Sequence, residues 1–305
     1  MLSHSVFNPV SPQALAISNL FIFLMVVSLL IILLIVGVLA YTLTHFRYRP
    51  GQEEPLPTFG ILRLEVIWTA IPFVLLVFVF VATVSAMELS SPPSDNAPDN
   101  HHPDLTVIGH QWWWELHYTS GVVSANEIHI PVGRRFLVAL QSVDVIHSLW
   151  LPQINGKIDL VPGQTNYMWL QADRAGTYEG TCAEYCGAAH ARMRVEVIAQ
   201  PLAQYLAWQS QQLAAPAAAS GVAAQGATLY QHLTCLSCHA TAIGPDLTHF
   251  GSRTTLAALT LTNTPANLAA WLHDPQAVKP GNHMPNFQLT NTQVQALTAY
   301  LESQK

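Results

Sequence analysis

The chain has 305 residues; half are hydrophobic, 10% are charged, and the formal net charge is −6. So high an apolar share is unusual for a wholly soluble protein, and the length suffices for two or three domains. The charges form no basic stripe and the sequence has no phosphate-cradling glycine loop, so binding to nucleic acid is not expected.

Two apolar runs near the N-terminus predict membrane spans. Leu20–Tyr41 is apolar apart from Ser28, and Val66–Ala86 forms a second run. At about 1.5 Å per residue, either run is long enough as a helix to cross a bilayer. Pro72 is expected in the first turns of its helix, where backbone N–H groups lack helical partners anyway. We predict a transmembrane helical hairpin over residues 1–90, with spans at about 18–43 and 66–87 in contact with membrane lipid.

The basic residues predict how this hairpin is oriented. Arg47, Arg49 and Arg63 lie between the two runs, whereas the segment before Leu20 contains neither Lys nor Arg. Because positive charge is enriched in cytoplasmic loops, the connection is expected inside and everything after Ala86 outside. The first residues also lack the pattern of a cleaved signal peptide. The predicted location is a bacterial inner (cell) membrane, with the remaining domains on the periplasmic or outer side.

Residues 104–200 have the pattern of a β-sandwich. Short β-rich runs alternate with turn signals such as Pro131-Val132-Gly133 and Pro162-Gly163. Ile128 and Ile130, like Val195 and Val197, alternate as core residues of strands would. The expected strands are Leu105–Tyr118, Glu127–Pro131, Arg135–Gln141, Asn166–Gln171, Thr177–Thr181 and Arg194–Ile198.

The last part of the chain has helical patterns. Residues 201–225 are expected to be a linker, because a short helix ending near Leu213 gives way to an Ala- and Pro-rich stretch. Residues 226–305 then predict a small all-α domain. Its expected helices are Gly226–Cys235, Pro265–Asp274 and Thr290–Ser303.

All four cysteines fall in two metal-type motifs, which indicates electron transfer. In the first, Cys182-Ala-Glu-Tyr-Cys186 is followed closely by His190 and Met193. Thiolates, imidazole and a thioether together favour copper. A zinc site and a Cys182–Cys186 disulfide are alternatives, but zinc gains little from a thioether and a disulfide would leave His190 and Met193 unexplained.

The second motif, Cys235-Leu-Ser-Cys238-His239, has the spacing of covalent c-type haem attachment. Both thiols would bond the haem and His239 would be an axial iron ligand. A zinc or thioredoxin-like site would not need the adjacent histidine. Met284 is the expected second axial ligand, because it is the single methionine after Met193 and has prolines on both sides. The rival ligands are His232, His249, His273 and His283.

With these motifs the chain resembles a known family over roughly residues 15–200: subunit II of haem–copper cytochrome c oxidases. Cys-x-Glu-x-Cys-x-x-x-His-x-x-Met is the pattern of its binuclear CuA centre. Further similar blocks are His147–Pro152, Lys157–Gly163, Gly109–Glu115 and Glu65–Thr69. The C-terminal part resembles a class I cytochrome c, including Gly244-Pro245-Asp246-Leu247. The implied folds are a cupredoxin-like Greek-key β-sandwich and a small all-α cytochrome c domain.

The resemblance implies a ligand set for the two coppers. Cys182 and Cys186 would bridge both metals, while His147 and His190 would each bind one. Met193 and the backbone carbonyl of Glu184 would be weak axial ligands on opposite metals. The other histidines of the domain compete with His147 for its role: His101, His102, His110, His117 and His129.

Three further roles are implied more loosely. The Glu184 carboxylate would reach a magnesium site at the border with subunit I, unless it is simply a solvated loop acid. Trp112 would receive electrons for CuA, unless it is a core residue or the fused haem delivers them elsewhere. Glu65 would lie at the mouth of a proton path into subunit I, unless it is an interfacial acid beside Arg63.

The implied function is subunit II of a cytochrome c oxidase with a fused cytochrome c. Electrons would pass from an upstream cytochrome or a quinol–cytochrome c reductase to haem c, then to CuA, and then to haem and CuB in subunit I. That subunit would reduce dioxygen to water and pump protons, with subunit III as a further partner. The alternatives are a CuA-bearing subunit of a nitric oxide reductase, a quinol oxidase subunit, and a membrane-anchored metal sensor or copper-delivery protein.

Overall fold

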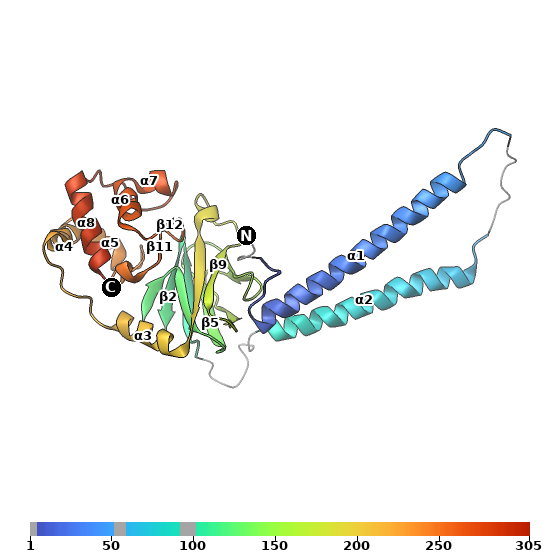
Figure 1. The fold of residues 1–305 in the computed structure, drawn as a ribbon, viewed down its shortest axis with the longest axis horizontal. Coiled ribbons are helices and arrows are strands. Elements are labelled where there is room, and N and C mark those ends of the chain that lie inside the picture. Colours follow the sequence, from blue (N-terminus) through green and yellow to red (C-terminus); the bar gives the residue numbers. More distant parts are fainter. Residues whose placement is uncertain (1–4, 52–58, 92–101) are drawn as a thin grey trace. The chain divides into compact units, whose positions relative to one another are not determined.

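The computed structural model describes residues 5–51, 59–91 and 102–305 (Figure 1). His101, one of the rivals of His147, lies outside these residues. The chain forms two compact units, one spanning Leu15–Leu89 and the other combining the segment up to Ala14 with residues 90–305.

The first unit consists of two long apolar helices, α1 (Pro12–His45) and α2 (Leu62–Ser90). Both are long and apolar enough to cross a membrane, and the apolar windows that would span it are not buried by protein. Phe23 of α1 meets Phe78 of α2 edge to face, with ring centroids 5.5 Å apart. Because α2 begins at Leu62, Pro72 lies inside the helix and not in its first turn as expected. A helix in lipid tolerates such a proline where neighbouring groups satisfy the freed carbonyl.

The second unit begins with a β-sandwich, as predicted. One sheet has the order β3-β2-β1-β5-β8 and the other β4-β10-β9-β6-β7. β1 is parallel to β5 and β4 to β10, while the other pairs are antiparallel. The strands are β1 (Leu105–His110), β2 (Trp113–Tyr118), β3 (Val123–Ala125), β4 (Glu127–Pro131), β5 (Phe136–Ser142), β6 (His147–Trp150), β7 (Ile158–Leu160), β8 (Asn166–Leu170), β9 (Gly176–Cys182) and β10 (Arg194–Gln200).

Three of these strands, β3, β6 and β7, are absent from the sequence prediction, and the run expected over Leu105–Tyr118 is two strands. β1 and β2 pair with each other as a hairpin that turns at Gln111 and Trp112. The sequence gives no sign of this turn, because residues 111–114 are Gln-Trp-Trp-Trp and include no Gly, Pro, Asn or Asp. The turn is important because it places Trp112 at one end of the sandwich.

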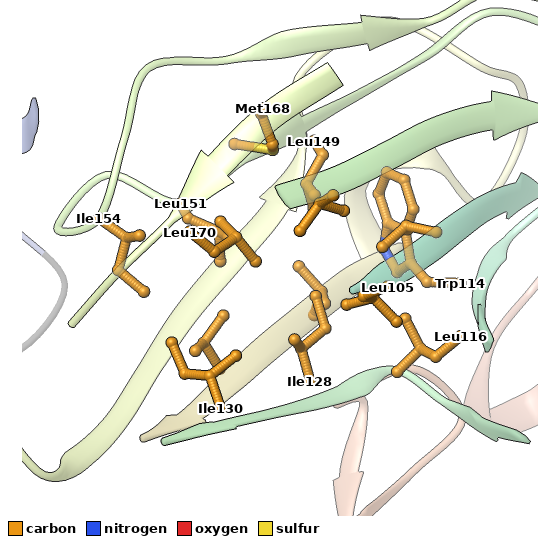
Figure 2. Packing of buried hydrophobic residues seen from close by; sticks show 14 of the residues in the cluster. Leu105, Trp114, Leu116, Ile128, Ile130, Leu149, Leu151, Ile154, Met168 and Leu170 are labelled. Atoms are coloured by element: carbon orange, nitrogen blue, oxygen red, sulfur yellow. The ribbon is translucent and has the colours of Figure 1, made fainter. Parts of the chain in front are cut away.

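Side chains from both sheets fill the sandwich core. Leu105 and Leu116 of one sheet meet Ile128 and Leu149 of the other (Figure 2). Ile128, Ile130, Val195 and Val197 are fully buried, which confirms them as core residues, although polar neighbours on the same strands, such as His129 and Glu196, are buried as well. Such a close-packed frame resists local movement, so the loops at its ends are anchored to rigid strands.

A helix follows the sandwich, α3 (Leu202–Leu213). Its Trp208 stacks on His129 of β4 with ring centroids 4.0 Å apart, and its Tyr205 is buried against Phe136. The first half of the expected linker is therefore ordered against the sandwich, and only residues 214–221 separate α3 from the next helix.

The C-terminal part is helical, with α4 (Val222–His232), α5 (Cys235–His239), α6 (Pro265–His273), α7 (Pro275–Val278) and α8 (Asn291–Ser303), plus a small hairpin of β11 (Thr255–Leu256) and β12 (Leu261–Thr262). α4 and α8 lie side by side (Figure 1). A glycine permits this approach, because a Cβ on Gly226 would be 2.0 Å from the carbonyl oxygen of Ala296. Thr290 and Gln293 form a capping box that begins α8.

His129 makes the stability of the sandwich depend on pH. Burial lowers the pKa of His129 from 6.5 to about 4, although a hydrogen bond with Gln200 opposes the shift. Below about pH 6.5 the His129 imidazole therefore binds a proton in the unfolded chain but not in the folded one. The free energy of unfolding falls as pH falls from 6.5 towards 4. The loss amounts to about 3 kcal/mol for a shift of this size.

We predict that His129→Phe, which keeps a ring beneath Trp208, removes this part of the acid sensitivity. Thermal unfolding followed by near-ultraviolet circular dichroism at pH 7 and at pH 4.5 measures it. The wild-type midpoint should fall further than that of the variant, and equal falls would contradict the assignment.

Candidate metal centres

The first centre lies at one end of the sandwich, where two chain segments bring sulfur and nitrogen donors together. His147 begins β6, Cys182 ends β9, and Cys186, His190 and Met193 follow in the loop before β10. The two Sγ atoms are 3.8 Å apart. Nδ1 of His147 is 3.9 Å from Sγ of Cys182, and Nδ1 of His190 is 3.5 Å from Sγ of Cys186. One imidazole therefore stands beside each thiol.

Two weaker donors complete the group. Sδ of Met193 is 3.8 Å from Sγ of Cys186, and the carbonyl oxygen of Glu184 is 3.2 Å from Sγ of Cys182. Cys182, Cys186, Met193 and His147 are buried, whereas the side chain of Glu184 is exposed. Among the residues that the structure describes, His147, Cys182 and Cys186 form the one compact group of metal-type side chains. His190 stands just outside it.

The two thiols differ in acidity. The contact between the two sulfurs lowers the pKa of Cys182 and raises that of Cys186. One thiolate is thus favoured before any metal binds, and a bound cation would stabilise the second.

A carboxylate orients the first imidazole. Nε2 of His147 donates to Asp144 at 2.8 Å, so Nδ1 is left with its lone pair towards the thiols. Burial would raise the pKa of Asp144, but hydrogen bonds from His147 and from the backbone of Val145 and Gln111 outweigh it, and the pKa lies below the ordinary value. Gly109 leaves room for the ring, because a Cβ there would be 2.7 Å from Cδ2 of His147.

The rival histidines have other partners. His110 and His117 both hydrogen-bond Glu115 at 2.8 Å, and His129 stacks on Trp208. The structure therefore leaves His147 beside the thiols and places these three elsewhere. Asp144 is a partner of the candidate ligand His147 that sequence reasoning missed; its position three residues before His147 was the available signal.

The second centre is an apolar cavity in the helical domain. Cys235, Cys238 and His239 of α5 line it together with Met284. Nδ1 of His239 donates to the carbonyl of Pro245 at 2.7 Å, which leaves Nε2 available to an iron. A Cβ on Gly244 would be 3.0 Å from this ring, so the glycine allows the close turn that brings Pro245 there.

The lining of the cavity distinguishes between the candidate axial ligands. Met284 and His283 line it, whereas His232, His249 and His273 do not. The Met284 loop is braced, because its backbone N–H donates to Asn282 at 2.8 Å and Gln276 donates to its carbonyl at 3.1 Å. The ring of His283 instead lies on Trp112, with ring centroids 4.8 Å apart.

Trp112 lies between the two centres. Its indole N–H donates to the carbonyl oxygen of Cys186 at 3.0 Å, and Gln111 donates to the same oxygen at 2.7 Å. Trp112 also lines the cavity of the second centre. Its ring is buried, so it is a packed residue as well as a contact between the centres.

Glu65 and Glu184 stand apart from these contacts. Glu65 is in the first turn of α2 and is exposed. Glu184 shares the loop of the copper-type donors, and its carboxylate faces outward.

Comparisons with known proteins follow the same division of the chain. Residues 5–86 match the family model for the transmembrane domain of cytochrome c oxidase subunit II, residues 121–200 that for its periplasmic domain, and residues 223–305 that for cytochrome c. A cytochrome c oxidase subunit 2 of Alkalihalophilus pseudofirmus is 38% identical over 98% of this chain and 90% of its own length. This chain belongs to the cytochrome c oxidase subunit II family.

Two further relatives show the same likeness at lower identity. The cytochrome c oxidase subunit 2 of Bacillus sp. (strain PS3) is 34% identical, covering 85% of this chain and 80% of the relative. Among solved structures, the periplasmic domain of subunit II (CoxB) of Bradyrhizobium japonicum is 28% identical with a TM-score of 0.35, covering 37% of this chain and 95% of that chain. The subunit II domain implies a CuA centre, the cytochrome c domain implies a haem c, and membership of an oxidase complex implies subunit I as a partner.

We predict that Asp144→Ala weakens copper binding about ten- to a hundredfold, because His147 loses the acceptor that fixes its ring. Competition with a copper chelator measures the affinity. Asp173→Ala, at an exposed carboxylate away from the centre, is the matched control and should bind copper as the wild type does. Equal affinity in Asp144→Ala would show that the ring needs no such support.

A second prediction concerns the haem iron. Replacing Met284 by Leu removes a thioether ligand, so the reduction potential of the haem should fall and its optical spectrum should lose the signature of sulfur ligation. His283→Leu should keep both the reduction potential and the optical signature of sulfur ligation. The opposite pattern in a redox titration would make His283 the ligand.

Proposed function

We propose that this chain is the electron-accepting subunit of an oxidase, in which a haem c on Cys235 and Cys238 passes electrons to a CuA centre and then to subunit I. Subunit I reduces dioxygen to water and couples the reaction to proton pumping. The observation that carries the proposal is Trp112, whose ring meets the haem cavity while its N–H bonds the carbonyl of Cys186. Gln111 makes the same pair of contacts, since it also lines the cavity and donates to the carbonyl of Cys186 at 2.7 Å.

The donors of the first centre fit two coppers. Sγ atoms 3.8 Å apart are placed to bridge a metal pair, with one imidazole beside each. His147 and His190 would each bind one copper, and Met193 and the carbonyl of Glu184 would be weak axial ligands. A copper pair bridged by thiolates supplies a one-electron carrier that changes little in geometry on reduction.

The chain's own residues keep this site rigid. Asp144 fixes the tautomer and direction of His147, and Gln111 and Trp112 both hold the carbonyl of Cys186. The ligand loop is tied to β10 and β9 of a close-packed sandwich. Burial of the thiols keeps water from the donors, so the environment is preorganised for a metal whose charge alternates.

The second cavity fits a covalently attached haem. It is apolar, both thiols of the attachment motif line it, and the His239 ring is turned by Pro245 to present Nε2. Met284 lines the same cavity from a braced loop. His and Met ligation would raise the potential of the haem, as a carrier that accepts electrons from an upstream cytochrome or a quinol–cytochrome c reductase needs.

The remaining roles extend the same proposal. The chain would be anchored in a bacterial inner membrane by α1 and α2, with both centres on the periplasmic side and subunit III beside subunit I. The exposed Glu184 carboxylate would contribute to a magnesium site at the border with subunit I. Glu65, exposed in the first turn of α2, would stand at the mouth of a proton path.

Replacing Cys186 by Ser in the purified complex tests the proposed order of carriers. The variant should lose oxygen consumption, because a bridging thiolate is missing, while its haem c is still reduced by the donor. Oxygen uptake is measured with an electrode and haem reduction by its visible band. Retained oxygen consumption would contradict the order, and reduction of nitric oxide instead of oxygen by the wild-type complex would favour the reductase alternative.

A further inference from the structure

The haem domain is held against the sandwich by polar contacts as well as by the chain that joins them. Nζ of Lys279 donates to the carbonyl of Trp112 at 2.7 Å, and a guanidinium N–H of Arg192 donates to the carbonyl of Val278 at 2.5 Å. On the far side of the contact, Glu127 of the sandwich accepts hydrogen bonds from the backbone and hydroxyl groups of Thr254 and Thr255.

Lys279 is the least expected member of this contact. Its side chain is only 3% exposed, and burial lowers its pKa to about 7, with Arg192 adding to the effect and Cys186 opposing it. A buried ammonium group is costly unless its hydrogen bonds are satisfied. Lys279 has two acceptors: the carbonyl of Trp112 in the sandwich and, at 3.1 Å, that of Ala257 in its own domain.

Lys279 is also connected to the haem side of the contact. Asn282 donates to the backbone carbonyl of Lys279 at 2.6 Å and accepts from the backbone N–H of Met284 at 2.8 Å. The Met284 loop therefore moves with Lys279. Between these two residues, a Cβ on Gly281 would be 2.8 Å from that of Ala188, so the loop lies directly on the copper ligand loop.

Through these contacts Lys279 fixes the Met284 loop of the haem domain against the copper ligand loop of the sandwich. Trp112 is held at its carbonyl by Lys279 and at its indole N–H by Cys186. His283, beside Met284, has its ring on that indole. A shift of the haem domain would break the Lys279 bond and open the His283–Trp112 contact together.

We propose that Lys279 is a positioning residue for electron transfer, which locks the haem domain in the one docked position where His283 lies on Trp112. This inference rests on the proposed transfer from haem c to CuA. In the locked state the electron crosses a fixed contact. Without the lock, the domain remains tethered by residues 214–221 and must find the contact by diffusion.

The test uses the purified oxidase with both metals bound. Haem c is reduced by a flash with a ruthenium photoreductant, and its reoxidation and the reduction of CuA are followed optically, with and without glycerol. The wild type should transfer electrons at a rate that does not depend on viscosity. Lys279→Met should slow transfer about tenfold or more, as expected if the docked state becomes a minor population, and the residual rate should fall with viscosity.

Two controls keep the result specific. Lys305→Met, at an exposed position, should behave as the wild type. The reduction potentials of both centres are measured in Lys279→Met, so that a change in driving force is separated from a change in docking. If that variant loses its sulfur-ligated haem spectrum, Glu127→Ala tests the docked position instead, since it removes the acceptor of the Thr254 and Thr255 hydrogen bonds and leaves Lys279 in place.

The outcomes are distinct. Wild-type rates without viscosity dependence in Lys279→Met, with both centres intact, would overturn the role of Lys279. The same result in Glu127→Ala would overturn the locked docking on which that role depends. A wild-type enzyme whose reduced haem c never passes its electron to CuA would instead overturn the proposed function.

Discussion

The hydrogen bond from the Trp112 indole to the carbonyl of Cys186 is the contact on which the account of this chain depends. It joins a residue of the β1–β2 hairpin to the loop that carries the copper-type donors, at 3.0 Å. Trp112 can reach that loop because the hairpin turns at the end of the sandwich where β6 begins and β9 ends. The same ring lines the haem cavity. One buried side chain therefore belongs to the surroundings of both centres.

The polar groups between the domains have a consequence for dynamics. Glu127 and Lys279 are buried in the contact and would each need new partners if the domains separated. Truncating a buried, hydrogen-bonded charge is expensive, whereas a tether alone only raises the local concentration of the partner. A tethered haem domain would meet the copper centre often but in varying orientations. A haem domain docked through matched polar groups keeps a constant distance between the two carriers.

How far the sequence could predict this structure depended on how far apart the interacting residues lie. Cys182, Cys186, His190 and Met193 share one loop, so their spacing was sufficient to bring them together. His147 lies 35 residues from Cys182, and only a family resemblance singled it out from the other histidines. Ile128 and Ile130 were predicted as core residues because alternation is a local signal.

Contacts across the domains had no such signal. Lys279 and Trp112 are 167 residues apart, and Glu127 and Thr254 are 127 apart. A lone lysine between a short helix and a proline indicates a solvated loop in a sequence, and only the packing of two domains buries it. The hairpin turn at Gln111 and Trp112 was missed for a different reason, since neither residue type is typical of a turn.

The central claim is that one chain holds a mixed-valence copper pair beside a c-type haem. Electron paramagnetic resonance of the purified, copper-replete oxidised protein tests it most directly, together with metal analysis. The account predicts two coppers and one haem per chain, with one unpaired electron shared equally by both copper nuclei. A signal from a single copper, or haem without any copper signal, would contradict it.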